Sequence, residues 1–207
     1  MKYVYEFIGT FILMLTVGMT LLGPNDAGLL APLAIGGALA VMVFAGGHIS
    51  GGHYNPAVSL AVFLRKKLSF KQLWEYWIVQ FTASVIAVCF TVYLKDSATV
   101  TPILFHPLKA FIAEFIFTFA LCYVVLNVAT VKATEKNSYF GWAIGLTVLV
   151  GAYAVGPISG AAFNPAVALG ISLLHLSHWS NIWIYLIANL LGGCAAAWVV
   201  NVAHPKE

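Results

Sequence analysis

The sequence ISGGHYNPAV at residues 49–58 returns as ISGAAFNPAV at residues 158–167. Both copies lie within apolar sequence, and each contains Asn-Pro, a favoured start of an α-helix. The asparagine side chain accepts hydrogen bonds from free backbone N–H groups of the first turn, and proline fills the first helical position, where no N–H partner is needed. Two helix starts inside a membrane bring two positive dipole ends into a region that excludes water. This pair therefore predicts a pore or a binding site between the two copies.

The composition indicates an integral membrane protein. Only 8% of the 207 residues are charged and 61% are hydrophobic, whereas a soluble domain has roughly 25% charged residues. The length suits one domain, residues 1–207. The formal net charge of +3 says little about acidic partners, and we expect no nucleic acid partner. Cys89, Cys122 and Cys194 all lie in apolar runs, which favours packing roles over a disulfide.

Six apolar stretches have the length that a membrane-spanning helix needs, which is roughly 20 residues. They cover approximately residues 3–22, 31–49, 73–94, 109–131, 139–156 and 179–202. Two shorter apolar pieces, approximately 55–64 and 164–174, are predicted to be half-helices that enter from opposite faces. The predicted fold is an all-α membrane protein with six transmembrane helices and two re-entrant half-helices.

The repeat extends beyond the two Asn-Pro copies. YEFIGTF at residues 5–11 matches AEFIFTF at residues 113–119. Each half of the chain, 1–100 and 101–207, therefore contains three spans and one half-helix. Because three is an odd number, the second half runs through the membrane inverted relative to the first, and the half-helices meet near the midplane.

The basic residues predict the orientation in the membrane. Lys2, Arg65, Lys66, Lys67, Lys71, Lys132, Lys136 and Lys206 fall on one predicted side, and only Lys95 and Lys109 fall on the other. Positively charged loops stay in the cytoplasm, so both termini are expected there. Short loops, no N-x-S/T sequon and no targeting segment favour a bacterial inner membrane.

The two Asn-Pro-Ala signatures, the early glutamates Glu6 and Glu114 and the inverted layout resemble the aquaporin and glycerol-facilitator family, also called the major intrinsic proteins. The resemblance covers nearly the whole chain. It implies a passive channel in a lipid bilayer for water and small neutral solutes, with no cofactor, no metal and no enzymatic activity. It also implies a homotetramer with one pore in each protomer.

The predicted midplane of the pore contains Asn55 and Asn164. Each is expected to present an amide N–H to the lumen beside a positive half-helix end, where a water or alcohol oxygen accepts from both. The same field repels cations and reverses the orientation of a water chain, which opposes proton passage. Half-helix packing is expected from Pro56, Ala57, Pro165 and Ala166.

The residues before each asparagine are predicted to be non-helical and to line the lumen. They are Gly51, Gly52 and His53 in the first copy, and Gly160, Ala161 and Ala162 in the second. Their backbone carbonyls need partners at membrane depth, and a water-filled lumen supplies them. The resemblance implies that these carbonyls form a ladder that guides the permeant.

Two alternatives are open for Glu6 and Glu114. A proton-coupled transporter uses intramembrane carboxylates, and such groups are functional candidates by default. Alternatively, each carboxylate accepts hydrogen bonds from the nearby re-entrant loop and supports it, which is what the resemblance implies. His48 and His53 either line the cytoplasmic vestibule or pack, and two histidines without a third ligand do not make a metal site.

The predicted selectivity filter departs from the family. Alignment on the two asparagines assigns the four constriction positions to Ile35, Ala152, Ala161 and Val167. Water-selective and glycerol-conducting members both keep an arginine here, but the only arginine of this chain is Arg65, in a predicted cytoplasmic loop. An arginine would bring five N–H donors and a positive charge to this position. Without them, the mouth is predicted to be wide and apolar. We expect water to pass together with glycerol, urea, ammonia or hydrogen peroxide.

Other classes of membrane protein give different expectations. An ion-coupled secondary transporter needs polar coordination between the repeats, for which only Glu6 and Glu114 are available. A non-conducting structural membrane protein predicts no change in osmotic permeability. An intramembrane enzyme is disfavoured, because the spans contain no Ser/His/Asp grouping, HExxH motif or paired aspartates.

Overall fold

The computed structural model describes residues 1–23, 26–96, 100–102 and 104–205, and its regular structure is helical throughout these ranges. Six helices are long and apolar enough to cross a membrane. They are α1 (Lys2–Leu21), α2 (Ala31–Ser50), α4 (Phe70–Leu94), α5 (Pro107–Thr130), α6 (Phe140–Ser159) and α8 (Ile182–Ala203). Single 3₁₀ turns, η1 (Gly28–Leu30), η2 (Lys132–Thr134) and η3 (Trp179–Asn181), lie in the connections. The six predicted spans are confirmed.

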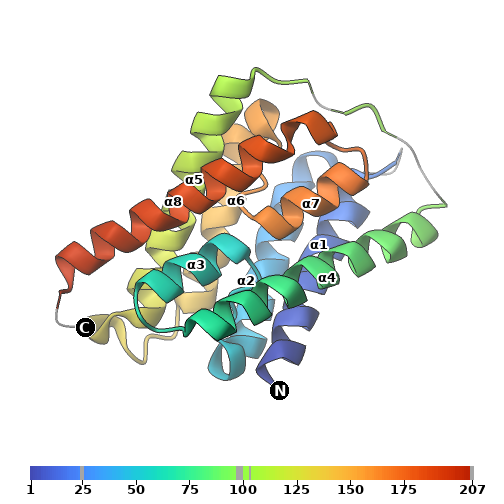
Figure 1. The fold of residues 1–207 in the computed structure, drawn as a ribbon. Coiled ribbons are helices and arrows are strands. Elements are labelled where there is room, and N and C mark those ends of the chain that lie inside the picture. Colours follow the sequence, from blue (N-terminus) through green and yellow to red (C-terminus); the bar gives the residue numbers. More distant parts are fainter. Residues whose placement is uncertain (24–25, 97–99, 103, 206–207) are drawn as a thin grey trace.

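Two short helices follow the Asn-Pro pairs. They are α3 (Pro56–Leu64) and α7 (Pro165–Leu173), each of nine residues. At 1.5 Å per residue, each is about 13 Å long, which is less than half of the roughly 30 Å of a bilayer core. Figure 1 shows both lying between α8 and α4, near the centre of the bundle. The all-α fold with two half-helices is therefore confirmed.

The two halves of the chain interlock. Within each half the first and last long helices pack together, α1 with α4 and α5 with α8, while α2 packs on α6 across the halves. Each half-helix packs most extensively on the last long helix of the opposite half, α3 on α8 and α7 on α4. Neither half can therefore bury its own half-helix without the other. The start of α1 and the end of α8 lie toward the same side of the molecule, opposite the end of α4 and the start of α5 (Figure 1).

Left-handed glycines end the helices that lead into the re-entrant loops. Gly51 ends α2 at a φ of 91°, and Gly160 ends α6 at a φ of 85°. This backbone conformation favours glycine, which has no Cβ. The sequence prediction stopped the fifth span at residue 156, but α6 continues through Pro157 to Ser159. A proline removes one helical hydrogen bond without ending this helix, and the turn at Gly160 ends it instead.

Small residues bring helix backbones into contact. A Cβ on Gly36 would lie 2.7 Å from the carbonyl oxygen of Gly145, and a Cβ on Gly145 would lie 2.4 Å from that of Gly36. On α8, a Cβ on Gly193 would lie 2.7 Å from the carbonyl oxygen of Ala57 on α3. Such contacts allow apolar helices to associate closely. Gly37, in contrast, has no such contact within 4 Å in the described part of the chain.

Candidate channel site

Both half-helices begin with an asparagine cap. Asn55 Oδ1 accepts from the backbone N–H of Ala57 at 2.8 Å, and Asn164 Oδ1 accepts from that of Ala166 at 2.9 Å. The caps leave the two amide nitrogens available for other bonds, and an amide nitrogen has two hydrogens to donate. The same capping geometry therefore fixes the N-terminus of each half-helix, which is the positive end of its dipole.

The amide nitrogens of the two asparagines tie the repeats together. Asn55 Nδ2 donates to the carbonyl oxygen of Phe163 at 2.8 Å, and Asn164 Nδ2 donates to that of Tyr54 at 2.9 Å. Each asparagine thus bonds to the residue that precedes its counterpart. The N-terminal ends of α3 and α7 are brought together, 109 positions apart in sequence, and both asparagines line the same cavity.

The first turns of the half-helices are buried and held by α4. The indole N–H of Trp77 donates to the carbonyl oxygen of Pro56 at 3.0 Å, and Ser84 Oγ donates to that of Ala166 at 2.6 Å. Ala57 and Ala166 are fully buried. The four residues assigned to half-helix packing, Pro56, Ala57, Pro165 and Ala166, are all buried in the two first turns.

Glu6 holds the first re-entrant loop. Its Oε1 accepts from the backbone N–H of His53 at 2.9 Å and from Ser50 Oγ at 2.7 Å. Its Oε2 accepts from the backbone N–H of Tyr54 at 2.7 Å and from Gln80 Nε2 at 2.9 Å. Four donors therefore surround a side chain with no exposed surface.

Glu114 has the equivalent position in the second half. Its Oε1 accepts from Ser159 Oγ at 2.7 Å and from the backbone N–H of Ala162 at 3.0 Å. Its Oε2 accepts from the backbone N–H of Phe163 at 2.8 Å. The Asn189 amide fits this site with its nitrogen facing the carboxylate, where it donates to Oε2 at 3.0 Å.

The positions of the two carboxylates bear on the alternatives left open by the sequence. Neither Glu6 nor Glu114 is among the residues that line the cavities in the described ranges. A buried carboxylate is tolerated when donors surround it, and here those donors come from the loop backbone. This geometry favours the loop-supporting role over proton transfer to a solute in the lumen.

The same environment includes residues that the sequence analysis did not single out for a role. Tyr76 Oη donates to the carbonyl oxygen of Ser50, and Tyr185 Oη donates to that of Ser159, both at 2.7 Å. These residues form pairs at the offset of the two asparagines: Ser50 with Ser159, Tyr76 with Tyr185, and Gln80 with Asn189. A search for polar residues 109 positions apart would have found them.

The re-entrant loops adopt a backbone conformation that is unfavourable for most residues. Tyr54, Ala161 and Phe163 have φ values of 49°, 51° and 48°. Such left-handed residues cost about 1–2 kcal/mol each, which the bonds to the two glutamates offset. No hydrogen bond to the carbonyl oxygens of residues 51–53 or 160–162 is found within the described part of the chain.

A cavity of about 320 Å³ extends from the two asparagines toward the connection between α1 and α2, and we call it the outer cavity because it lies on the side away from the start of α1 and the end of α8. It is lined by all four residues assigned to the selectivity filter, Ile35, Ala152, Ala161 and Val167, and by the loop residues Gly52, His53, Gly160 and Ala162. Of its described lining residues, none is lysine, arginine, aspartate or glutamate. The cavity wall is consequently apolar except for loop backbone, the two asparagines, His53 and Tyr54.

The single arginine lies at the opposite end of the half-helix. Arg65 follows the last residue of α3 and is 4% exposed. Its guanidinium donates to Asn201 Oδ1 at 3.1 Å and to the carbonyl oxygen of His204 at 3.0 Å. The arginine therefore fixes the end of α3 to the end of α8 and does not contribute to the outer cavity.

An inner cavity of about 790 Å³ lies on the other side of the asparagines. It shares three lining residues, His53, Val125 and Ile144, with the outer cavity, so the two meet at these residues. The His53 ring combines both roles considered for it: it lines both cavities, packs edge-on against Tyr76, and places Nδ1 3.1 Å from Ser59 Oγ. His48 and Gly51 line the inner cavity.

Comparisons with known proteins match this arrangement. The family model described as Major intrinsic protein matches residues 2–200. Nodulin-26 from Glycine max is 38% identical over 170 residues, which cover 80% of this chain but only 62% of that protein, less than two thirds of its length. Putative aquaporin NIP4-1 from Arabidopsis thaliana is 32% identical over 213 residues, which cover 97% of this chain and 74% of that protein. A solved structure, the aquaglyceroporin from Plasmodium falciparum, has the same fold, with a TM-score of 0.82 at 23% identity, covering 99% of this chain and 96% of that one.

Proposed function

This chain belongs to the major intrinsic protein family, and we propose that its two half-helices form a passive pore for water and small uncharged solutes with a wide, apolar outer mouth. As a member of a family of channels, it is not an enzyme. One observation supports the pore most strongly: the cavity lined by both asparagines adjoins a second cavity, with which it shares His53, Val125 and Ile144.

The midplane acts on a permeant through its dipoles. A water or alcohol oxygen beside Asn55 and Asn164 meets amide nitrogens and two positive helix ends, so it is oriented with its oxygen toward them. The carbonyls of the re-entrant loops accept its hydrogens on either side. A cation meets the same positive ends and is repelled, and a chain of waters is turned in opposite directions on the two sides.

The outer mouth provides little to select against larger neutral solutes. Ile35, Ala152, Ala161 and Val167 are apolar, and two of them are alanines. A permeant at this level has no charged side chain to bind and no long side chain to obstruct it. We therefore propose that glycerol, urea, ammonia or hydrogen peroxide passes together with water.

Substitution of Val167 by arginine tests the position of this filter. The guanidinium would narrow the mouth and add N–H donors, so we expect glycerol and urea permeability of proteoliposomes to fall roughly tenfold, which corresponds to about 1.4 kcal/mol in the barrier. Val167→Met is the matched control, because it adds a long side chain without donors or charge. Both variants should slow solutes, but only Val167→Arg should retain water permeability. Unchanged or increased solute flux in both would place the constriction elsewhere.

The proposal also covers the orientation of the chain in the membrane and its oligomeric state. The lysine distribution supports cytoplasmic placement of both termini. The resemblance to the family supports a homotetramer with a pore in each protomer. The bacterial inner membrane stays a prediction from the sequence alone, and nodulin-26 and NIP4-1 come from plants. Protease accessibility of tags on either terminus in sealed cells tests the orientation.

A further inference from the structure

We propose that lysines lining the inner cavity form an electrostatic barrier to cations, so that charge selection takes place at the inner mouth rather than at the outer one. The inference rests on the proposed pore and specifies how it rejects charged solutes. It concerns mainly Lys2, Lys67 and Lys136.

The inner cavity gathers positive charge from separate parts of the chain. Four lysines line it: Lys2 at the start of α1, Lys67 in the turn after α3, Lys132 in η2 and Lys136 in the turn before α6. Glu135 is the one carboxylate among its described lining residues. With four lysines and one glutamate among these residues, the formal charge of the wall is positive.

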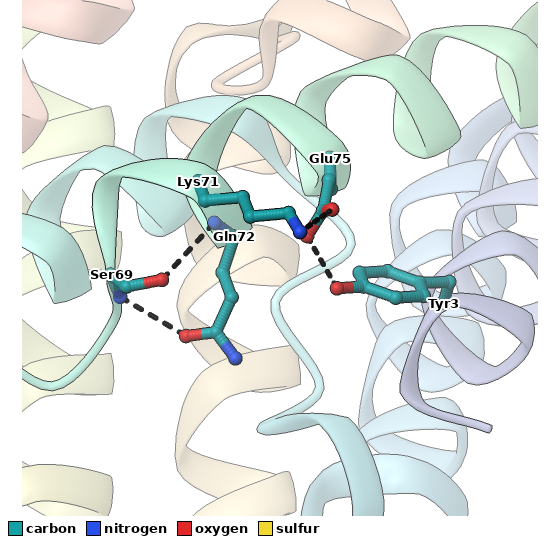
Figure 2. A network of polar contacts seen from close by, with 5 residues as sticks. All are labelled: Tyr3, Ser69, Lys71, Gln72 and Glu75. Atoms are coloured by element: carbon teal, nitrogen blue, oxygen red, sulfur yellow. Dashed lines mark hydrogen bonds and ion pairs between the residues drawn. The ribbon is translucent and has the colours of Figure 1, made fainter.

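Other carboxylates near this mouth are engaged elsewhere. Figure 2 shows Glu75, near the start of α4, accepting from Tyr3 Oη and facing Lys71, whose Nζ lies 3.8 Å from its Oε1. The adjacent capping box of Ser69 and Gln72 fixes the beginning of that helix, with bonds of 3.1 and 3.2 Å. Glu75 is not among the described residues that line the inner cavity, and its charge is paired with that of Lys71, which is not among them either.

The outer cavity differs sharply in charge. None of the residues known to line it is a lysine, arginine, aspartate or glutamate. A cation that enters from the outside meets an apolar wall and then the midplane dipoles, whereas a cation that enters from the inside meets ammonium groups first. A barrier at one end of a single pore rejects cations moving in both directions.

The size of the inner cavity allows these charges to act at physiological salt. A sphere of about 790 Å³ is roughly 11 Å across, so its centre lies within one Debye length, roughly 8 Å at physiological ionic strength, of the wall. Low-dielectric walls focus the potential of charges that line a cleft, and the local ion concentration changes by tenfold or more. Neutral solutes are not affected by this potential.

Guanidinium and urea provide a sharp test, because both are small, planar and rich in N–H donors and differ chiefly in charge. Uptake of tracer amounts of each is measured in proteoliposomes that contain the full chain. The test variant combines Lys2→Gln, Lys67→Gln and Lys136→Gln. The matched control combines Lys66→Gln, Lys95→Gln and Lys109→Gln, which removes the same charge from lysines outside the described lining of both cavities.

We expect the test variant to take up guanidinium roughly tenfold faster than the wild type at low salt, while its urea uptake is unchanged. The control variant should behave as the wild type. Unchanged guanidinium uptake in the test variant, with normal urea uptake, would overturn the inference. Absence of urea, glycerol and water permeability in the wild type would instead contradict the proposed pore itself.

The wild type alone gives a second test that does not depend on the folding of any variant. Raising the salt concentration from 10 mM to 1 M shortens the Debye length from roughly 30 Å to roughly 3 Å. Guanidinium uptake by the wild type should rise with salt, while urea uptake stays constant. Guanidinium uptake that is equal at both salt concentrations contradicts the barrier.

Discussion

At the scale of single residues, each re-entrant loop depends on one buried carboxylate. Glu6 and Glu114 occupy equivalent places in the two halves, and each accepts two backbone N–H bonds from the loop before the asparagine. These bonds hold loop residues in the left-handed conformation. The carboxylates therefore determine where the loop carbonyls and the two asparagines lie.

The substitution Glu6→Gln is expected to destabilise the protein. An amide has one acceptor oxygen where the carboxylate has two, so at least one loop donor loses its partner at a fully buried site. Such a loss costs about 1–3 kcal/mol. Thermal unfolding of the purified protein in detergent measures it. The exposed Glu135→Gln serves as the control, and equal midpoints for both variants would mean that the bonds to Glu6 contribute nothing.

Mercurial sensitivity tests which residue faces the lumen at the outer mouth. Ala161 lines the outer cavity, whereas Cys89, Cys122 and Cys194 are not among the described residues that line either cavity. We expect the wild type to be insensitive to mercurials and Ala161→Cys to be blocked, because a bound mercury atom obstructs the passage. Swelling of proteoliposomes with and without a mercurial and a thiol reductant measures the block. Reversible inhibition of the wild type would place a native cysteine beside the lumen.

At the scale of secondary structure elements, the half-helices are held by close contacts with long helices of the other half. The carbonyl oxygen of Ala57 on α3 approaches Gly193 on α8 so closely that no side chain fits between them. On the opposite side, Ser84 of α4 bonds to α7. The position of each half-helix therefore depends on the partner half as well as on its own.

The contact between α3 and α8 is tested with one methyl group. Gly193→Ala places a Cβ 2.7 Å from the carbonyl oxygen of Ala57, so the helices must separate, at a cost of about 1–3 kcal/mol. Gly37→Ala is the matched control on α2, where the Cβ meets no described contact within 4 Å and alanine favours the helix by up to about 1 kcal/mol. The melting temperature should fall for the first variant and hold or rise for the second. A stable, fully permeable Gly193→Ala protein would contradict this account of the packing.

The sequence allowed most of these elements to be predicted, for identifiable physical reasons. Span length and the Asn-Pro start are local properties, so the six spans and the beginnings of α3 and α7 were predicted from the sequence. The end of α6 was not, because whether Pro157 is tolerated depends on what surrounds it. The contact of α3 with α8 depends on the packing of the whole chain, which no local pattern contains.

The polar residues around the glutamates were not predicted from the sequence, for a different reason. Ser50, Tyr76 and Gln80 are distant in sequence from Glu6, and nothing in their local sequence points to it. Their counterparts at the same offset in the second half contain this information. The predicted filter positions came from the family resemblance, and the structure places all four on one cavity wall without testing what they select.

At the scale of the whole molecule, the inverted repeat gives a nearly symmetric scaffold with unlike ends. The same loop position is His53 in the first half, which lines both cavities, and Ala162 in the second, which lines only the outer cavity. The inner cavity is lined by lysines and the outer cavity by apolar side chains. Selection by charge and selection by size are thereby separated along one passage.

The central claim, a wide and apolar pore for small neutral solutes, is tested most directly by stopped-flow swelling of proteoliposomes in gradients of glycerol and urea, with water permeability measured on the same vesicles. We predict faster water flow than in empty vesicles and entry of at least one of the two solutes. Fast water flow with both solutes rejected would contradict the wide mouth, and permeability equal to that of empty vesicles would contradict the channel.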